Sequence, residues 1–211
     1  MARKKFFFAT KLYPITDVRI SGLSHAEQVE QLSAGGATLI QLREKHLSPR
    51  EFYGEAEKAL RVARSRGVRI IINDRVDIAL ALHADGVHLG QDDLSPEVAR
   101  SLLGEDAIIG FSTHTIEQAQ GALTMPIDYI AVGPIFSTAT KDKPDPIVGL
   151  DALHRVREIV GHFPLVAIGG IGLEQAALVI AVGADAVAVI SALVAEGSSI
   201  QDRTKDLRSR L

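Results

Sequence analysis

Short apolar runs rich in β-branched residues alternate with longer helical segments along almost the whole chain of 211 residues. This alternation is typical of parallel strands joined by helical crossovers. Eight runs have the length of a strand, namely residues 11–16, 38–43, 69–73, 86–90, 107–112, 128–133, 164–169 and 186–191. They predict an α/β fold, a (β/α)8 TIM barrel, with an open doubly wound sheet as the competing arrangement. We expect one barrel domain over residues 1–211, since no linker or shift in composition divides the chain.

Helix start signals stand between the predicted strands. Three pairs have the spacing of a capping box: Ser24 with Glu27, Ser48 with Glu51, and Thr115 with Gln118. Two prolines, Pro49 and Pro96, occupy first-turn positions. A third, Pro14, lies inside the first strand and lacks a backbone donor, so we expect that strand to be bulged or shorter than drawn.

Composition narrows the classes of function. The formal net charge is -3 and the pI is near 6.2, so the overall charge indicates neither a nucleic-acid nor a membrane partner. The chain has no cysteine, which excludes disulfides and thiolate metal sites and fits a cytoplasmic location. The apolar run near the N-terminus is too short for a secretory signal or a transmembrane span. Oligomeric state stays open, and a homo-oligomer is compatible with the sequence.

Charged residues gather directly after the predicted strands, where the βα loops of either architecture form a site. Asp74 and Asp93 follow adjacent strands and suit Mg²⁺, which is held by one or two carboxylates together with water and phosphate oxygens. Arg43, Lys45 and Lys141 follow the second and sixth strands and supply positive charge. Positively charged side chains that face a pair of carboxylates suit a polyanionic ligand and a metal ion bound between the two groups. For any single pair, a salt bridge on the barrel rim is the alternative.

Glycines and a serine follow the last two strands. Gly169 and Gly170 end the seventh, ahead of a helical segment, and Ser191 ends the eighth. The loops after strands seven and eight form the usual phosphate site of TIM barrels, where backbone amides meet the anion. This position favours a phosphate site over simple turn formation.

Seven segments, "QLREK", "IIND", "GVHLGQDD", "GFSTHT", "VGPIFSTATK", "VAIGG" and "AVISAL", occur in the order and spacing of one enzyme family. From about Leu12 to Leu193 the chain resembles thiamine phosphate synthase, also called thiamine-phosphate pyrophosphorylase. The resemblance implies a transferase of thiamine biosynthesis with Mg²⁺ as cofactor. It would join hydroxymethylpyrimidine diphosphate to hydroxyethylthiazole phosphate and release pyrophosphate. In that family the bond to diphosphate is thought to break first, leaving a pyrimidine cation that the thiazole nitrogen captures.

The resemblance also implies roles for individual residues. Asp74 and Asp93 would bind the metal. The diphosphate would contact Arg43, Lys45, Asn73 and Lys141, the pyrimidine Gln41, and the leaving group Ser112. The thiazole partner would lie against Thr138 and Thr140, with its phosphate near Gly170, Ile190 and Ser191. Ser112, Lys141 and Arg43 would act directly on the reacting groups.

Several residues have open roles. Asp92 is expected to support Asp93 or to interact with a helix dipole. His88 lies inside a strand, as a hydrogen-bonded interior residue or a catalytic one, and His114 follows the fifth strand near Ser112. The remaining histidines are expected on the surface: His25, His46, His83, His154 and His162.

Two other functions stay in view, a thiazole tautomerase of the same superfamily and a non-catalytic phosphate-binding regulator. A tautomerase needs a positioned acid–base residue, and at the sixth strand end, where a histidine could serve, this chain has Gly133-Pro134. A regulator would have little use for so many like charges, which are costly to keep together unless a ligand compensates them.

Overall fold

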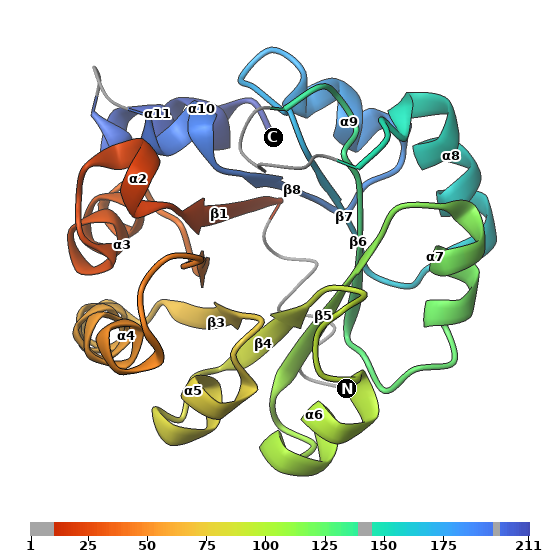
Figure 1. Cartoon of the computed structure of the whole chain (residues 1–211). Helices are drawn as coiled ribbons and strands as arrows, with labels where there is room; N and C mark the ends of the chain where they lie inside the picture. Colours follow the sequence, from red (N-terminus) through yellow and green to blue (C-terminus); the bar gives the residue numbers. More distant parts are fainter. Residues whose placement is uncertain (1–10, 139–144, 196–198) are drawn as a thin grey trace.

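The computed structural model describes residues 11–138, 145–195 and 199–211. Eight parallel strands pair in sequence order and close into a barrel (Figure 1). The strands are β1 (Leu12–Thr16), β2 (Leu39–Leu42), β3 (Arg69–Asn73), β4 (Gly86–Leu89), β5 (Ile108–Thr113), β6 (Tyr129–Val132), β7 (Leu165–Ile168) and β8 (Ala186–Val189). The predicted TIM barrel is confirmed, and the closed ring of pairs excludes the open sheet.

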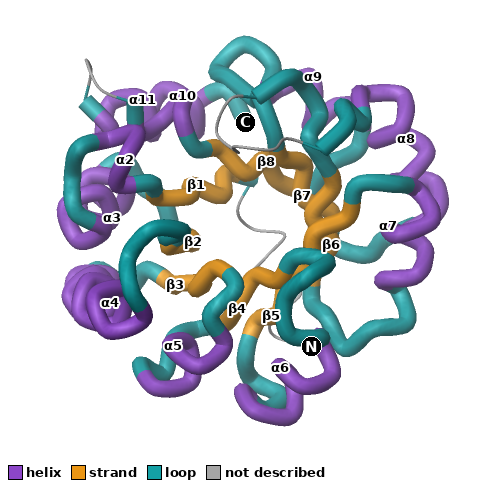
Figure 2. Tube along the Cα trace, in the orientation of Figure 1, coloured by secondary structure: helices purple, strands orange, loops and turns teal. Residues whose placement is uncertain are grey.

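Helices surround the strands, as Figure 2 shows. They are α2 (Val18–Ser21), α3 (His25–Ala34), α4 (Pro49–Ser65), α5 (Val76–Ala81), α6 (Pro96–Leu103), α7 (Ile116–Ala122), α8 (Gly149–Val160), α9 (Ala176–Val182), α10 (Ser191–Val194) and α11 (Ile200–Ser209). Within the described ranges no helix combines the length and the apolar character that crossing a membrane requires.

The helix start signals are mostly confirmed. Ser24 and Ser48 both form reciprocal capping boxes. The third box was wrong in part, because Thr115 accepts from the Gln118 backbone while the Gln118 side chain accepts from the His114 N–H at 2.7 Å. The side chain therefore reaches one residue further back than a capping box requires.

Pro14 is accommodated without a bulge. β1 pairs with β8 residue by residue through Leu12, Tyr13 and Pro14, and it begins one residue later than predicted. The missing N–H therefore costs the barrel neither its register nor its closure.

The barrel interior is filled by side chains that alternate along each strand. Apolar and aromatic residues fill most of it: Tyr13, Ile15, Leu39, Ile71, Ile108, Tyr129, Ala131, Val166, Ala186 and Ala188. Gly110 leaves room for Tyr129, since a Cβ there would lie 2.0 Å from the Tyr129 Cζ. The same alternation aims residues near the strand ends inward, so the top layer is polar and faces the βα loops.

The opposite end of the barrel is fastened by two ion pairs, which we call the base clamps. Arg100 of α6 donates to Asp128 at 2.7 Å, and Arg157 of α8 donates to Asp185 at 2.6 Å. Each aspartate directly precedes a strand and also accepts a backbone N–H from the neighbouring strand at 2.8 Å. The base clamps therefore tie a helix to two strands at the amino ends of β6 and β8.

Candidate active site

A cavity of about 1100 Å³ opens at the carboxyl ends of the strands. Every predicted site residue that the structure describes lines it: Gln41, Arg43, Lys45, Asn73, Asp74, Asp93, Ser112, Thr138, Gly170, Ile190 and Ser191. Thr140 and Lys141 lie outside the described residues. These residues come from the ends of seven strands, and Ile15 and Asp17 of the cavity wall add the end of β1.

The two predicted metal ligands, Asp74 and Asp93, lie together. Burial raises the pKa of the Asp74 carboxyl, the ion pair with Lys45 acts in the opposite direction, and the neighbouring Asp93 carboxyl raises it further. Asp74 has φ of 60°, an uncommon left-handed conformation for a residue with a side chain. Asp93 is held by the Gly90 N–H at 2.6 Å. Two adjacent carboxylates with one cationic partner form an electrostatically strained group that a metal would relieve.

The positive side of the cavity has a partner that the sequence analysis missed. Arg43 donates to Asp17 at 2.7 Å, and both side chains are largely buried. Asp17 also caps α2 by accepting from the backbone of Arg19 and Ile20. Because Asp17 follows β1 directly, the rule applied to the other strand ends would have identified it. Its carboxylate fixes the direction in which Arg43 points.

Asn73, which lies in the cavity wall, has an unused side-chain donor. Its side chain is buried at the end of β3, and its Nδ2 has no hydrogen-bond partner among the described residues. A buried donor without an acceptor costs about 1–3 kcal/mol. Such a group is explained when a ligand supplies the acceptor.

Five polar residues form a continuous chain of hydrogen bonds across the barrel interior, which we call the interior chain. Gln41 Nε2 donates to Tyr13 Oη at 3.1 Å, which lies 3.0 Å from Tyr129 Oη. Tyr129 Oη is 2.9 Å from His88 Nδ1, and His88 Nε2 is 2.9 Å from Ser112 Oγ. His88 is therefore an interior histidine bonded at both ring nitrogens, and it also reaches the cavity wall.

The loop after β7 requires glycine. Gly169 and Gly170 have φ of 101° and 63°. A Cβ on Gly170 would lie 2.4 Å from the Ser137 carbonyl oxygen, so the two loops after β6 and β7 pack backbone to backbone. Ser191 starts α10 at the end of β8, beside this loop in the cavity wall. Because the two glycines have no side chains, an anion in the cavity could approach the backbone of this loop closely.

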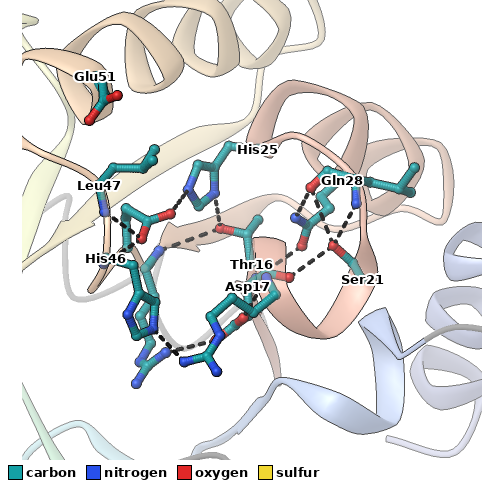
Figure 3. Close-up of polar contacts among 12 residues, drawn as sticks. Thr16, Asp17, Ser21, His25, Gln28, His46, Leu47 and Glu51 are labelled. Carbon is teal, nitrogen blue, oxygen red and sulfur yellow. Dashed lines mark hydrogen bonds and ion pairs between the residues drawn. The ribbon is translucent and has the colours of Figure 1, made fainter.

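One histidine was wrongly placed on the surface. His25 is fully buried, with Nδ1 2.7 Å from Thr16 Oγ1 and Nε2 3.5 Å from Glu44 (Figure 3). Burial lowers the pKa of His25, although Glu44 opposes that shift. The other four, His46, His83, His154 and His162, are exposed as predicted.

His114 and Asp92 also lie at the cavity. His114 Nδ1 is 2.7 Å from the Gly133 carbonyl oxygen, and its Nε2 is 3.6 Å from Asp145. Asp92 is exposed beside Asp93. The contacts of His114 and the position of Asp92 do not assign a chemical role to either residue.

Comparison with known proteins agrees with this geometry. Residues 12–193 match the family model described as thiamine monophosphate synthase. The chain belongs to this family. A thiamine-phosphate synthase of Chloroflexus aurantiacus is 47% identical over 186 residues, which is 88% of this chain and 85% of the relative. Another, of Clostridium novyi, is 46% identical over 198 residues, 93% of this chain and 96% of the relative.

A solved structure extends the comparison to three dimensions. Thiamine phosphate pyrophosphorylase from Pyrococcus furiosus superposes with a TM-score of 0.86 at 36% identity, covering 97% of this chain and 96% of that chain. The thiamine monophosphate synthase family thus accounts for both the sequence and the barrel of the protein.

Proposed function

We propose that the protein condenses hydroxymethylpyrimidine diphosphate with hydroxyethylthiazole phosphate, giving thiamine phosphate and pyrophosphate. Thiamine-phosphate synthase activity, and with it a place in thiamine biosynthesis, follows from the close homology to enzymes of that name. The observation that carries the chemical proposal is the meeting of Asp74 and Asp93 with Arg43 and Lys45 in one cavity. This set suits a diphosphate accompanied by a divalent cation.

Mg²⁺ fits the carboxylate pair, with Asp74 and Asp93 as its protein ligands. Burial and the neighbouring carboxylate raise the pKa of Asp74, so a cation there would favour its ionised form. In the described part of the chain no cluster of three or more His, Asp or Glu forms a site made by protein alone. Magnesium suits such a site because it keeps water and shares phosphate oxygens. When bound, it would neutralise charge on the departing diphosphate.

The cationic side chains would hold the diphosphate. Arg43 is oriented by Asp17 and offers further N–H donors, and Lys45 forms an ion pair with Asp74. The unpaired Asn73 amide would donate to a phosphate oxygen. Lys141 is proposed as a further diphosphate ligand and lies outside the described residues. Donors aimed at the oxygens that gain charge lower the barrier more than they stabilise the ground state.

The reaction would proceed by loss of pyrophosphate before attack. Gln41 would hold the pyrimidine, and the Ser112 hydroxyl would donate to the leaving oxygen. The thiazole nitrogen would then capture the pyrimidine cation, with Thr138 and Thr140 beside the ring and Gly170, Ile190 and Ser191 around its phosphate. Positioning supplies much of the rate in this scheme, since the ring nitrogen already carries its lone pair.

Pyrophosphate release by the purified protein tests the proposal. The assay combines both substrates with Mg²⁺ or with EDTA, and includes Asp93→Ala. We expect release that needs both substrates and the metal and falls by at least about a hundredfold in the variant. Asp92→Ala, at the exposed neighbouring carboxylate, is the matched control and should lose far less. No release by the wild-type protein, with thiazole phosphate still bound, would favour the tautomerase or the regulator instead.

A further inference from the structure

The interior chain connects two ends of the proposed site. Gln41, proposed to hold the pyrimidine, and Ser112, proposed to meet the leaving group, are joined through Tyr13, Tyr129 and His88. The three intermediate residues come from β1, β6 and β4 and are buried. Their rings also pack together, with Tyr13 edge-on to Tyr129 and His88 stacked on Tyr129 at 5.5 Å between centroids.

The direction of these hydrogen bonds follows from counting donors. A Tyr hydroxyl has one hydrogen to donate, and a neutral imidazole has one donor and one acceptor nitrogen. Tyr13 accepts from Gln41 Nε2, so its own hydrogen goes to Tyr129 Oη, the other contact of this hydroxyl. Tyr129 then donates to His88 Nδ1. His88 must therefore carry its proton on Nε2 and donate it to Ser112 Oγ.

The same direction fixes what each end offers to the cavity. Ser112 Oγ accepts from His88, so its hydroxyl hydrogen is available to a ligand. At the other end, Gln41 donates inward through its nitrogen, which leaves the amide oxygen to accept from a ligand. Reversing the amide of Gln41 would reverse every bond, and Ser112 would then donate to His88 rather than to the leaving group.

Burial keeps the two tyrosine hydroxyls of the interior chain protonated, so that they can donate hydrogen bonds. It raises the pKa of the hydroxyls of both Tyr13 and Tyr129. Both tyrosines therefore remain protonated across the pH range in which the protein would work. The direction of the bonds is set by the orientation of the Gln41 amide and not by the loss of a tyrosine proton.

We propose that Tyr13, Tyr129 and His88 are positioning residues that hold the Ser112 hydroxyl as a donor to the leaving diphosphate when Gln41 accepts from the pyrimidine. This rests on the proposed function and deepens it. Recognition of the correct ring at one end of the chain orients the leaving-group donor at the other. A pyrimidine that offers no donor to Gln41 loses this advantage.

The central test interrupts the hydrogen bonds of the interior chain with Tyr129→Phe, which keeps the ring and removes the hydroxyl. We expect kcat to fall by about tenfold, the equivalent of one lost hydrogen bond, with KM for the thiazole phosphate unchanged. In a Ser112→Ala background the same change should have little further effect, because the donor it orients is gone. Tyr53→Phe, at an exposed tyrosine of α4, is the control and should match the wild type. Wild-type kcat in Tyr129→Phe overturns the proposal.

A measurement without turnover gives the second test. Nitrogen-15 NMR of the histidines reports which ring nitrogen of His88 carries the proton, and the Nε2–H form is expected. Tyr13→Phe removes the first two links, from Gln41 to Tyr13 and from Tyr13 to Tyr129, and should let the Nδ1–H form appear. An Nδ1–H form in the wild-type protein overturns the inference even if the enzyme is active. Absence of pyrophosphate release by the wild type counts against the proposed function, so the two failures are distinct.

Discussion

Gly110 offers a sharp test of how tightly the barrel interior is packed. A methyl group at this position would lie 2.0 Å from Cζ and 2.3 Å from Oη of Tyr129. Carbon atoms pack at about 3.5–4.0 Å, so the ring would have to move by about 1.5 Å. Tyr129 is fully buried and stacks on His88, which leaves it little space to move. We therefore place the cost of Gly110→Ala at the upper end of the overpacking range, about 3 kcal/mol of unfolding free energy.

Urea unfolding followed by circular dichroism measures this change. The midpoint should fall while the slope stays the same, since the exposed surface on unfolding hardly changes. Gly121→Ala is the matched control. Gly121 lies within α7 with no atom near the added methyl, and the same substitution should stabilise by about 0.5–1 kcal/mol. Equal stability of Gly110→Ala and the wild type would refute the packing argument.

Three further predictions address the base clamps, the Asp74 carboxyl and the glycine loop after β7. Arg157→Met should lower the unfolding free energy by about 3 kcal/mol, because Asp185 would remain partly buried without its partner, and kcat below the melting transition should be unchanged. The pKa of Asp74 is raised in the folded protein. The contribution of Asp74 to the free energy of unfolding is therefore full below the ordinary pKa of 3.8 and is lost as the pH rises through the raised pKa. Asp74→Asn should flatten this decline in denaturation curves recorded without metal. Gly170→Ala, at a φ of 63° and against the Ser137 carbonyl, should raise KM for the thiazole phosphate more than KM for the pyrimidine diphosphate, and equal changes in both would contradict the assignment of this loop.

Much of this architecture was readable from local sequence because each βα unit carries its own signals. Strands appear as β-branched runs, and the serine caps of α3 and α4 are determined within four residues. The site residues were found by their position directly after strands, and all those in the described ranges line the cavity. Asp17 obeys the same rule, but the partner that gives it a role, Arg43, lies 26 residues further along the chain.

Contacts between distant segments were beyond local reasoning. The surface placement of His25 failed because one of its two partners, Glu44, belongs to the next βα unit. The role of His88 stayed open for the same reason, since Tyr129 lies 41 residues away. Alternation correctly placed His88 near the interior, but only the closed barrel shows which side chains it meets there.

The base clamps have a consequence for how such a barrel can be altered. Each spans 28 residues from its arginine to its aspartate, so the same fastening occurs twice, at the far end from the cavity. Loops on the cavity side can therefore be lengthened or exchanged without disturbing either fastening. In protein engineering, the end with the base clamps could be kept unchanged while the βα loops at the cavity are redesigned to bind a different phosphorylated compound.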